Sequence, residues 1–440
     1  MPAVPADELE NPFPIAPAST RLGLLQRGRG AGFAMALRDG ARAHADLLHC
    51  LLHDPRLDPE LEARSRYYAE LVVALALPLE PLLAGLRAFD EPQLGHEVLA
   101  ALWRLDHARA RAVVADERTD ERLLAGIVAS LWTAGWATAV QLPPHAEALW
   151  RRCALQHADC AQAEPPPPPL PALATATVDE LLAAASESGA DRRARLRDAL
   201  CARDGAATRA RLAAVVHDDL DYERVLLAAQ ALGQLGDLRL MPLAEAHFAR
   251  DDTFVDGAPT LPSNVRMRRS CLAEYVQHLP PPTALALARD HHRRGGYFRT
   301  VAGCVFQEHA TAADRELLAA AIEARQPAEG GLDVICELDA LGRLADPRSA
   351  PLLVEVADEA TYSHARRRAV HALAALPELP EAQRVLREAL WDCEDETVAD
   401  ACAFLPQLDA AARARVAAMA QQPLVAAELA ERASRRLRRP

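Results

Sequence analysis

The chain of 440 residues contains no lysine, and all 49 of its basic residues are arginine. A Walker A phosphate loop, the strand lysine of a protein kinase, a pyridoxal Schiff base and an aldolase imine all require a lysine amine. The sequence therefore excludes these classes of enzyme. Abundant alanine, proline and leucine agree with a GC-rich coding sequence as the origin of the arginine preference.

Aromatic residues make up only 4% of the chain, although half of all residues are apolar. A core made from alanine, leucine and valine, with little isoleucine or threonine, favours closely packed helices over sheets. At this length we expect either two or three compact domains or a solenoid without a fixed size.

Long apolar runs are also missing, since prolines and a glutamate interrupt the stretch from Val72 to Leu86. A membrane-spanning helix needs about 20 apolar residues, and residues 1–10 lack the pattern of a signal peptide. A net charge of −13 repels nucleic-acid phosphates and anionic lipids. We therefore expect a cytoplasmic protein without membrane insertion, and nucleic acid is not its default partner. The nine cysteines lack paired spacing, which indicates reduced thiols, with a Cys153–Cys160 bridge as the less favoured alternative.

Proline-rich stretches divide the chain. The first 18 residues carry five prolines, which predicts an extended arm or a strap lying on the first helices. Pro165–Pro169 predict a polyproline-type linker, which serves as a spacer or as an SH3-type ligand. Thr177 and Glu180 then form a capping box that restarts the helices. The expected domains are an arm at 1–19, a helical block at 20–157, the linker at 158–175 and a helical block at 176–440.

Apolar residues recur at helical spacing throughout the chain, as in residues 47–52. No stretch shows a sustained alternation of polar and apolar residues, so we predict no sheet. Similar helix-ending phrases return about every 30 residues, for example at Leu344, Leu376 and Leu408. A period of this length predicts stacked pairs of helices.

Two of these phrases, ALGQLGDLRLMPLAEA at 231–246 and ALGRLADPRSAPLLVE at 340–355, resemble HEAT repeats of the type first described in phycobilisome lyases. In that family Leu-Gly-x-Leu-x-Asp closes one helix and Asp-Pro-Arg opens the next. The resemblance implies that Asp237 and Asp346 cap helix N-termini. It also implies an all-α fold, a right-handed α-α superhelix (HEAT-like solenoid) in two helical blocks, and a binding role rather than a reaction.

Two histidine motifs raise the question of metal binding. His49 and His53 lie four residues apart on one helix face, beside His44 and Cys50, which is a workable ligand spacing. The favoured interpretation is partly buried histidines at a helix end. His96-Glu97 resembles one of the His-Glu pairs of the HEAT-like deoxyhypusine hydroxylases, which build a di-iron site from several such pairs, but the other pairs are missing. We predict no bound metal and no cofactor.

The sequence GRGAG at 28–32 looks similar to a phosphate loop, but it follows a stretch of helical period rather than a strand. We expect Gly28 and Gly32 either to let another helix approach closely or to break the first helix. The arginines around them would then form an exposed basic edge; they are Arg21, Arg27 and Arg29.

The most basic segment of this acidic chain is 264–299, which has seven arginines against Glu274 and Asp290. It follows a loop insertion at 253–266 that lengthens one repeat. Arginine forks bind carboxylate or phosphate, and aromatic rings offer stacking surfaces, so we predict an anionic partner here. The predicted partner-binding residues are Arg266, Arg268, Arg269, Arg289, His292, Arg293, Arg294, Tyr297, Phe298 and Arg299. The alternative is that these arginines pair with acidic residues of neighbouring repeats.

Other charged segments are expected to be structural. Arg366–Arg368 are expected to pair with Asp346 or Glu355, and the acidic run Asp392–Glu396 is expected to be solvated.

The leading functional hypothesis is a non-catalytic scaffold or adaptor that binds another protein, one with an acidic surface, along an extended helical-repeat surface. No complete catalytic constellation can be recognised, although triads are spatial and escape a sequence reading. The alternative is a nucleic-acid-binding protein or enzyme resembling the HEAT-like DNA glycosylases, with the basic segment lining a groove. Steep salt dependence would distinguish phosphate binding from binding by an apolar groove.

Overall fold

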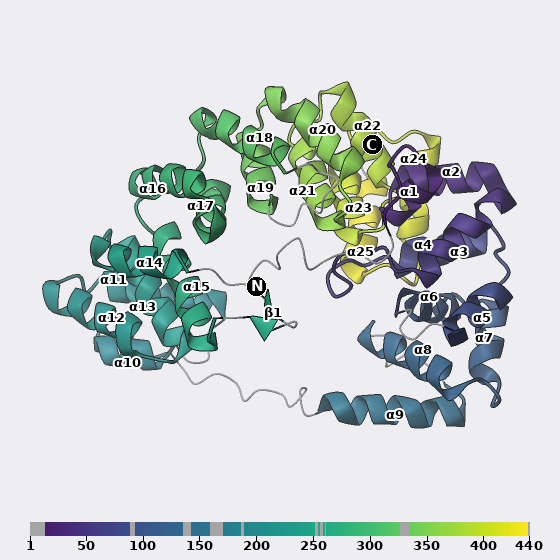
Figure 1. The fold of residues 1–440 in the computed structure, drawn as a ribbon, viewed down its shortest axis with the longest axis horizontal. Coiled ribbons are helices and arrows are strands. Elements are labelled where there is room, and N and C mark those ends of the chain that lie inside the picture. The colour runs from purple at the N-terminus through teal and green to yellow at the C-terminus, as the bar shows by residue number, and fades with distance from the viewer. Residues whose placement is uncertain are drawn as a thin grey trace. The chain divides into compact units, whose positions relative to one another are not determined.

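The computed structural model describes residues 14–88, 93–134, 142–158, 170–185, 189–250, 254–255, 258–259, 261–325 and 334–438. Almost all regular structure in these residues is helical, which confirms the expected all-α fold (Figure 1). The expectation of no sheet is wrong in one detail, because the insertion forms a short antiparallel ladder between β1 (Phe254–Val255) and β2 (Ala258–Pro259). The handedness of the superhelix stays a prediction.

The chain divides into two compact units, one containing Ala163–Arg315 and the other containing Leu9–Gln162 and Glu316–Pro440. The helices of the first unit are α10 (Val178–Ala183), α11 (Ala190–Cys201), α12 (Ala206–Asp218), α13 (Tyr222–Gln234), α14 (Met241–Phe248), α15 (Ser263–Gln277), α16 (Pro281–Arg294) and α17 (Gly296–His309). The N-terminal segment of the second unit contains α1 (Arg21–Gln26), α2 (Gly30–Asp39), α3 (His44–Leu52), α4 (Ser65–Ala74), α5 (Glu80–Ala88), α6 (Gln93–Arg104), α7 (Ala108–Ala115), α8 (Glu121–Thr133) and α9 (Pro144–Ala158). The remaining helices are α18 (Arg315–Glu323), α19 (Ile335–Leu344), α20 (Ala350–Glu359), α21 (Ser363–Ala374), α22 (Pro380–Ala389), α23 (Asp395–Phe404), α24 (Ala410–Met419) and α25 (Ala427–Leu437). Short 3₁₀ turns are η2 (Gly40–Ala43), η4 (Leu238–Leu240), η5 (Ala312–Asp314) and η7 (Pro347–Ser349).

This grouping differs from the expected blocks of 20–157 and 176–440. The last 125 residues group with the N-terminal helices in one unit, where α2 contacts α22. The first change of unit, at Ala163, falls inside the expected linker at 158–175, whose proline run lies outside the described residues.

Helix pairs stack in rows inside each unit. In the first unit α11, α13, α15 and α17 contact one another in succession, and α12, α14 and α16 cover them. In the second unit α19, α21, α23 and α25 form one row and α20 and α22 form another (Figure 1). This arrangement of alternating helices is the one that a period near 30 residues predicts.

Local sequence chemistry sets several helix starts. The Asp237 carboxylate accepts a hydrogen bond from Arg239 N at the start of η4, and Asp346 accepts one from Arg348 N at the start of η7. Thr177 and Glu180 form the expected capping box at α10. These three predictions are confirmed, and each cap stabilises its helix by about 0.5–2 kcal/mol.

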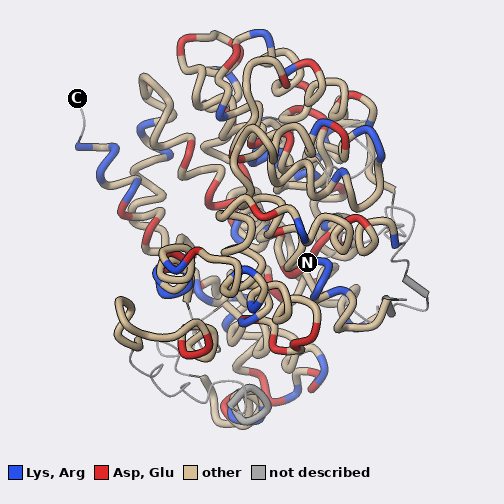
Figure 2. The backbone as a smooth tube through the Cα atoms, turned by 90° about the vertical axis from the view of Figure 1, so that its left-hand side faces the viewer, with Lys and Arg blue, Asp and Glu red and all other residues tan. Residues whose placement is uncertain are grey.

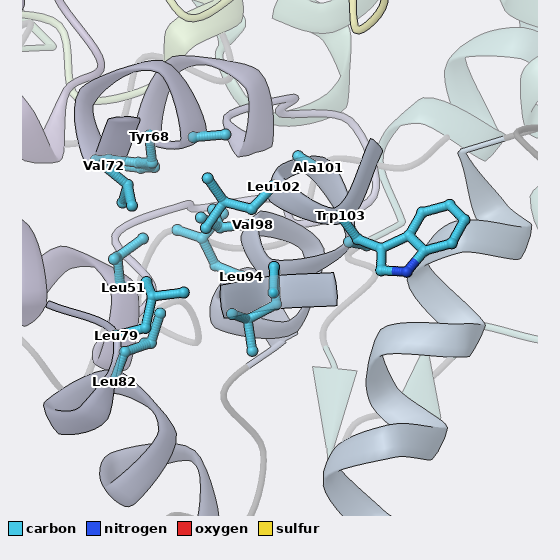
Figure 3. Packing of buried hydrophobic residues seen from close by; sticks show 14 of the residues in the cluster. Leu51, Tyr68, Val72, Leu79, Leu82, Leu94, Val98, Ala101, Leu102 and Trp103 are labelled. Atoms are coloured by element: carbon cyan, nitrogen blue, oxygen red, sulfur yellow. The ribbon is translucent and has the colours of Figure 1, made fainter. Parts of the chain in front are cut away.

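The core of the second unit is built from leucine, valine and alanine. Leu51 of α3, Leu82 of α5 and Leu94 of α6 point toward one another (Figure 3). Cys393 and Leu424 belong to the same buried cluster, so the N-terminal and C-terminal segments share one core. Full burial of each such leucine contributes roughly 1.5–3 kcal/mol.

Candidate functional site

The ten predicted partner-binding residues all lie in the first unit. Arg266, Arg268 and Arg269 are on α15, Arg289 to Arg294 are in the last turns of α16, and Tyr297 to Arg299 begin α17. Because α17 packs against both α15 and α16, the fold brings these segments close together.

Several of these side chains stack on one another. The guanidinium of Arg269 lies 4.0 Å from the centre of the Tyr297 ring, and that of Arg294 lies 3.5 Å from the centre of the Phe298 ring. Arg269 and Phe298 are buried. The aromatic rings therefore stack first on arginines of the chain itself.

Other arginines of the set bind groups of the same unit. Arg289 Nε and Nη2 donate to the two oxygens of the buried Asp314 carboxylate at 2.6 and 3.1 Å. Arg268 Nη2 donates to the Asp219 carbonyl at 2.9 Å. Acidic and basic residues are interspersed along the backbone (Figure 2), in line with such internal pairing.

Two arginines at the end of α16 still reach solvent. The Arg293 side chain is 68% exposed and the Arg294 side chain 37%, and their acidic neighbours Asp290 and Glu245 lie 3.7 and 3.8 Å away. Gly295 has a positive φ of 73° and ends the helix, with open space where a Cβ would stand. Arg289 is also 39% exposed, but the buried Asp314 holds its charge, so the basic edge is defined by Arg293 and Arg294.

Inside that edge lies a residue that sequence reasoning did not select. His291 is buried between Phe248 and Phe298, and neither ring nitrogen has a hydrogen-bond partner. Burial lowers the pKa of His291, and the charge of Arg294 lowers it further. The neutral ring acts as part of the apolar contact that joins α16 to α17.

The histidine motifs do not assemble a metal site within the described residues. The rings of His49 and His53 lie 4.6 Å apart, but no group of three or more His, Cys, Asp and Glu side chains suited to a metal occurs in that part of the chain. Glu97 instead accepts hydrogen bonds from Arg56 Nη1 and Nη2 at 2.9 and 3.0 Å.

The GRGAG segment is a packing motif. Gly28 has a positive φ of 68°, ends α1, and its carbonyl accepts a hydrogen bond from Cys393 N at 2.9 Å. A Cβ at Gly30 would lie 2.2 Å from the Glu388 carbonyl oxygen, and one at Gly32 would lie 2.8 Å from the backbone of Leu24. The glycines therefore allow close approach to α1 and to the C-terminal repeats, as the sequence predicted.

The expectation of an exposed basic edge beside these glycines is wrong for two of its members. Arg27 and Arg29 are both buried. Arg29 Nη2 forms ion pairs with Asp358 at 2.7 Å and with Glu388 at 2.8 Å, so acidic residues of α20 and α22 hold it.

The acidic run also differs from expectation. Asp392 and Glu394 are buried rather than solvated, and Arg366 Nε and Nη2 donate to the Asp392 carboxylate at 2.9 and 3.1 Å. The expected partners of Arg366–Arg368 were wrong, although pairing itself occurs. The observed pairs are Arg366 with Asp392, Arg367 with Glu396 and Arg368 with Asp339.

A surface hollow of about 520 Å³ lies over α21, α23 and α25. Its walls include the Phe404 side chain, which is 44% exposed, and charged groups of both signs. His371 Nδ1 lies 3.0 Å from Asp400 Oδ2, and this hydrogen bond raises the pKa of the His371 imidazole.

Charged pairs cross this face at a constant separation in the sequence. Asp339 pairs with Arg368 and His371 pairs with Asp400, and in both pairs the partners are 29 positions apart. The repeat period therefore places opposite charges on neighbouring helices of one row. This regularity is the sequence signal that could have identified the face.

Comparison with known proteins gives one match. No curated protein and no solved structure matches the chain significantly. Among the described residues, no helix combines the length and the hydropathy needed to cross a membrane. Residues 338–405, which run from α19 to the loop after α23 and form the walls of much of the hollow, match the family model of HEAT repeats.

Proposed function

We propose that the chain is a non-catalytic scaffold that binds another protein on the face of α21, α23 and α25. The observation that carries this proposal is the hollow of about 520 Å³, because two of its three helices, α21 and α23, lie in the stretch that matches HEAT repeats. HEAT repeats stack into long surfaces that commonly mediate protein interactions.

The chemistry of the face indicates the kind of partner. Phe404 offers an exposed ring for an apolar anchor, while Arg368, His371 and Asp400 offer charged groups of both signs. A partner segment with one large apolar side chain flanked by charged residues fits this lining. Cytoplasmic location and kinship with phycobilisome-lyase-type repeats belong to the same proposal.

Affinity capture from nuclease-treated lysate of the native host tests the face. We expect a discrete protein to be retained by the wild type and lost with Phe404→Ala. The matched control is Tyr222→Ala, because Tyr222 is an aromatic residue of the first unit with nearly the same exposure, 45% against 44%. Retention by the Phe404 variant would move the binding site away from this face.

The basic edge at Arg293 and Arg294 is a second surface for an acidic partner of the same scaffold. Reversing both charges to glutamate removes capture if this edge makes the contact. Capture of nucleic acid from untreated lysate, released by modest salt, would favour the glycosylase-like alternative instead.

A further inference from the structure

The N-terminal helices and the C-terminal repeats cap one another. Glu388 of α22 accepts a hydrogen bond from Ala31 N, at the start of α2, at 3.2 Å. In return, Glu62 accepts one from Ser363 N, at the start of α21, at 3.0 Å. Carboxylates are favourable at helix N-termini because the free N–H groups and the helix dipole attract negative charge.

Glu62 is a buried carboxylate with many donors. Arg64 Nη2 donates to its Oε2 at 2.6 Å, and Leu57 N and Asp58 N donate to its Oε1 at 2.6 and 3.1 Å. Although burial raises it, the charge of Arg64 and the hydrogen bonds from Ser363 hold the pKa of Glu62 low, at about 2. Glu62 therefore stays ionised.

Glu394 is a second buried carboxylate at the same place. The Ser363 hydroxyl lies 2.6 Å from Glu394 Oε1, so Ser363 touches Glu62 with its backbone and Glu394 with its side chain. Within the described residues, no arginine forms an ion pair with Glu394. Only one of the two carboxylates at this junction therefore has a cationic partner.

The charges of the other groups around Glu394 already balance one another. They are Glu62, Arg64, Tyr362, His364, Arg366, Asp392 and Cys393. Glu62 is paired with Arg64 and Asp392 with Arg366. Ionisation of Glu394 adds a buried negative charge without a counter-ion, which is costly in a low-dielectric site.

We propose that residues 14–74 form a releasable closure on the C-terminal repeats, and that a proton on Glu394 at the Glu62–Ser363–Glu394 junction strengthens this closure. The closure holds most tightly in mildly acidic conditions and weakens as the pH rises through neutrality. This inference is independent of the partner-binding face.

The direction follows from the protonation of Glu394 in the two states. In the closed state burial raises the pKa of Glu394 to about 7, and the charges of Glu62 and Asp392 add to the rise. In the open, solvated state the pKa returns to its ordinary value of 4.5. Between pH 4.5 and about 7 Glu394 is ionised mainly in the open state, so the closure loses strength over this range, and the effect levels off above it. Each unit of difference between the two pKa values changes the opening constant tenfold in total. The part of this change that falls between pH 6 and 8.5 is about tenfold.

Hydrogen–deuterium exchange of the full chain tests this closure. The reporter peptides cover residues 57–62 and 361–366, whose amides bind Glu62. After correction for intrinsic exchange, we expect about tenfold faster exchange at pH 8.5 than at pH 6. Peptides from α13, in the other unit, should show no such change.

Two variants at the start of α23 separate the proton from general effects of charge. Glu394→Gln keeps a neutral hydrogen-bonding group beside Ser363 and should reduce the pH effect to less than twofold. The matched control is Glu396→Gln, because the Glu396 side chain is 59% exposed and should leave the wild-type pH profile unchanged. A wild type with no pH effect, or a Glu394 variant with the full effect, overturns the proposal.

Ser363→Ala provides an independent variant. It removes the hydroxyl that stabilises ionised Glu394, so exchange at pH 8.5 should exceed that of the wild type while exchange at pH 6 changes less. Equal acceleration at both pH values would indicate a purely structural role for this contact and would count against the proposal.

Discussion

Replacing Gly28 with alanine places a methyl group inside the contact between the N-terminal helices and the C-terminal repeats. The new Cβ would lie 2.4 Å from Cys393 Sγ and 2.7 Å from Cys393 Cβ. The residue would also have to keep a φ of 68°, which costs about 1–2 kcal/mol for a residue with a side chain. Overpacking of a buried site adds about 1–3 kcal/mol. We therefore expect the second unit to lose about 2–5 kcal/mol of unfolding free energy.

Tryptophan fluorescence during urea unfolding measures this loss, because Trp103, Trp132, Trp150 and Trp391 lie in the second unit and the sequence from 163 to 315 contains no tryptophan. Gly40→Ala is the control, since Gly40 has a similar φ of 57° and open space where the Cβ would stand. Gly40→Ala should show the cost of a positive φ without an overlap like that with Cys393. A Gly28 variant as stable as the Gly40 variant would mean that Gly28 does not pack against Cys393.

Three further changes test separate parts of the fold. Arg366→Met leaves the buried Asp392 without its partner and should cost about 3–5 kcal/mol by urea unfolding, whereas Arg367→Met, at a more exposed pair, should cost less than about 1 kcal/mol. His291→Phe should abolish a loss of stability below about pH 6.5. The lowered pKa keeps His291 neutral in the folded unit, while the unfolded chain takes up the proton. Hydrogen–deuterium exchange in α16 measures this loss, and a variant with the pH profile of the wild type would contradict the prediction. Asp346→Ala removes a cap and should cost about 0.5–2 kcal/mol by the fluorescence assay, and an unaltered midpoint would argue against the capping role.

The features that were predicted from the sequence depend on residues that are close to one another in the sequence. Asp346 accepts a hydrogen bond from a backbone amide two positions later, and Thr177 and Glu180 bond each other across one turn. Such contacts are nearly independent of the rest of the fold, so the residue types alone predict them. The same holds for the helical period and for Gly28 where its positive φ ends α1.

The features that were missed depend on distant partners. Arg29 meets Asp358 across 329 positions, and Glu62 meets Ser363 across 301. No local pattern distinguishes such an arginine from a solvated one. The pairs of the candidate face are intermediate, because a separation of 29 positions follows from the repeat period once the register of the helices is known.

The discontinuous second unit has a consequence for synthesis on the ribosome. Residues 14–74 cannot bury their contact surface until the repeats up to Arg415, which pairs with Glu70, have been made. At roughly 5–20 residues per second, the nascent N-terminal helices wait roughly 20–70 s for that partner. The unit of Ala163–Arg315 is complete before then, so it can fold first while the N-terminal surface stays open to chaperones.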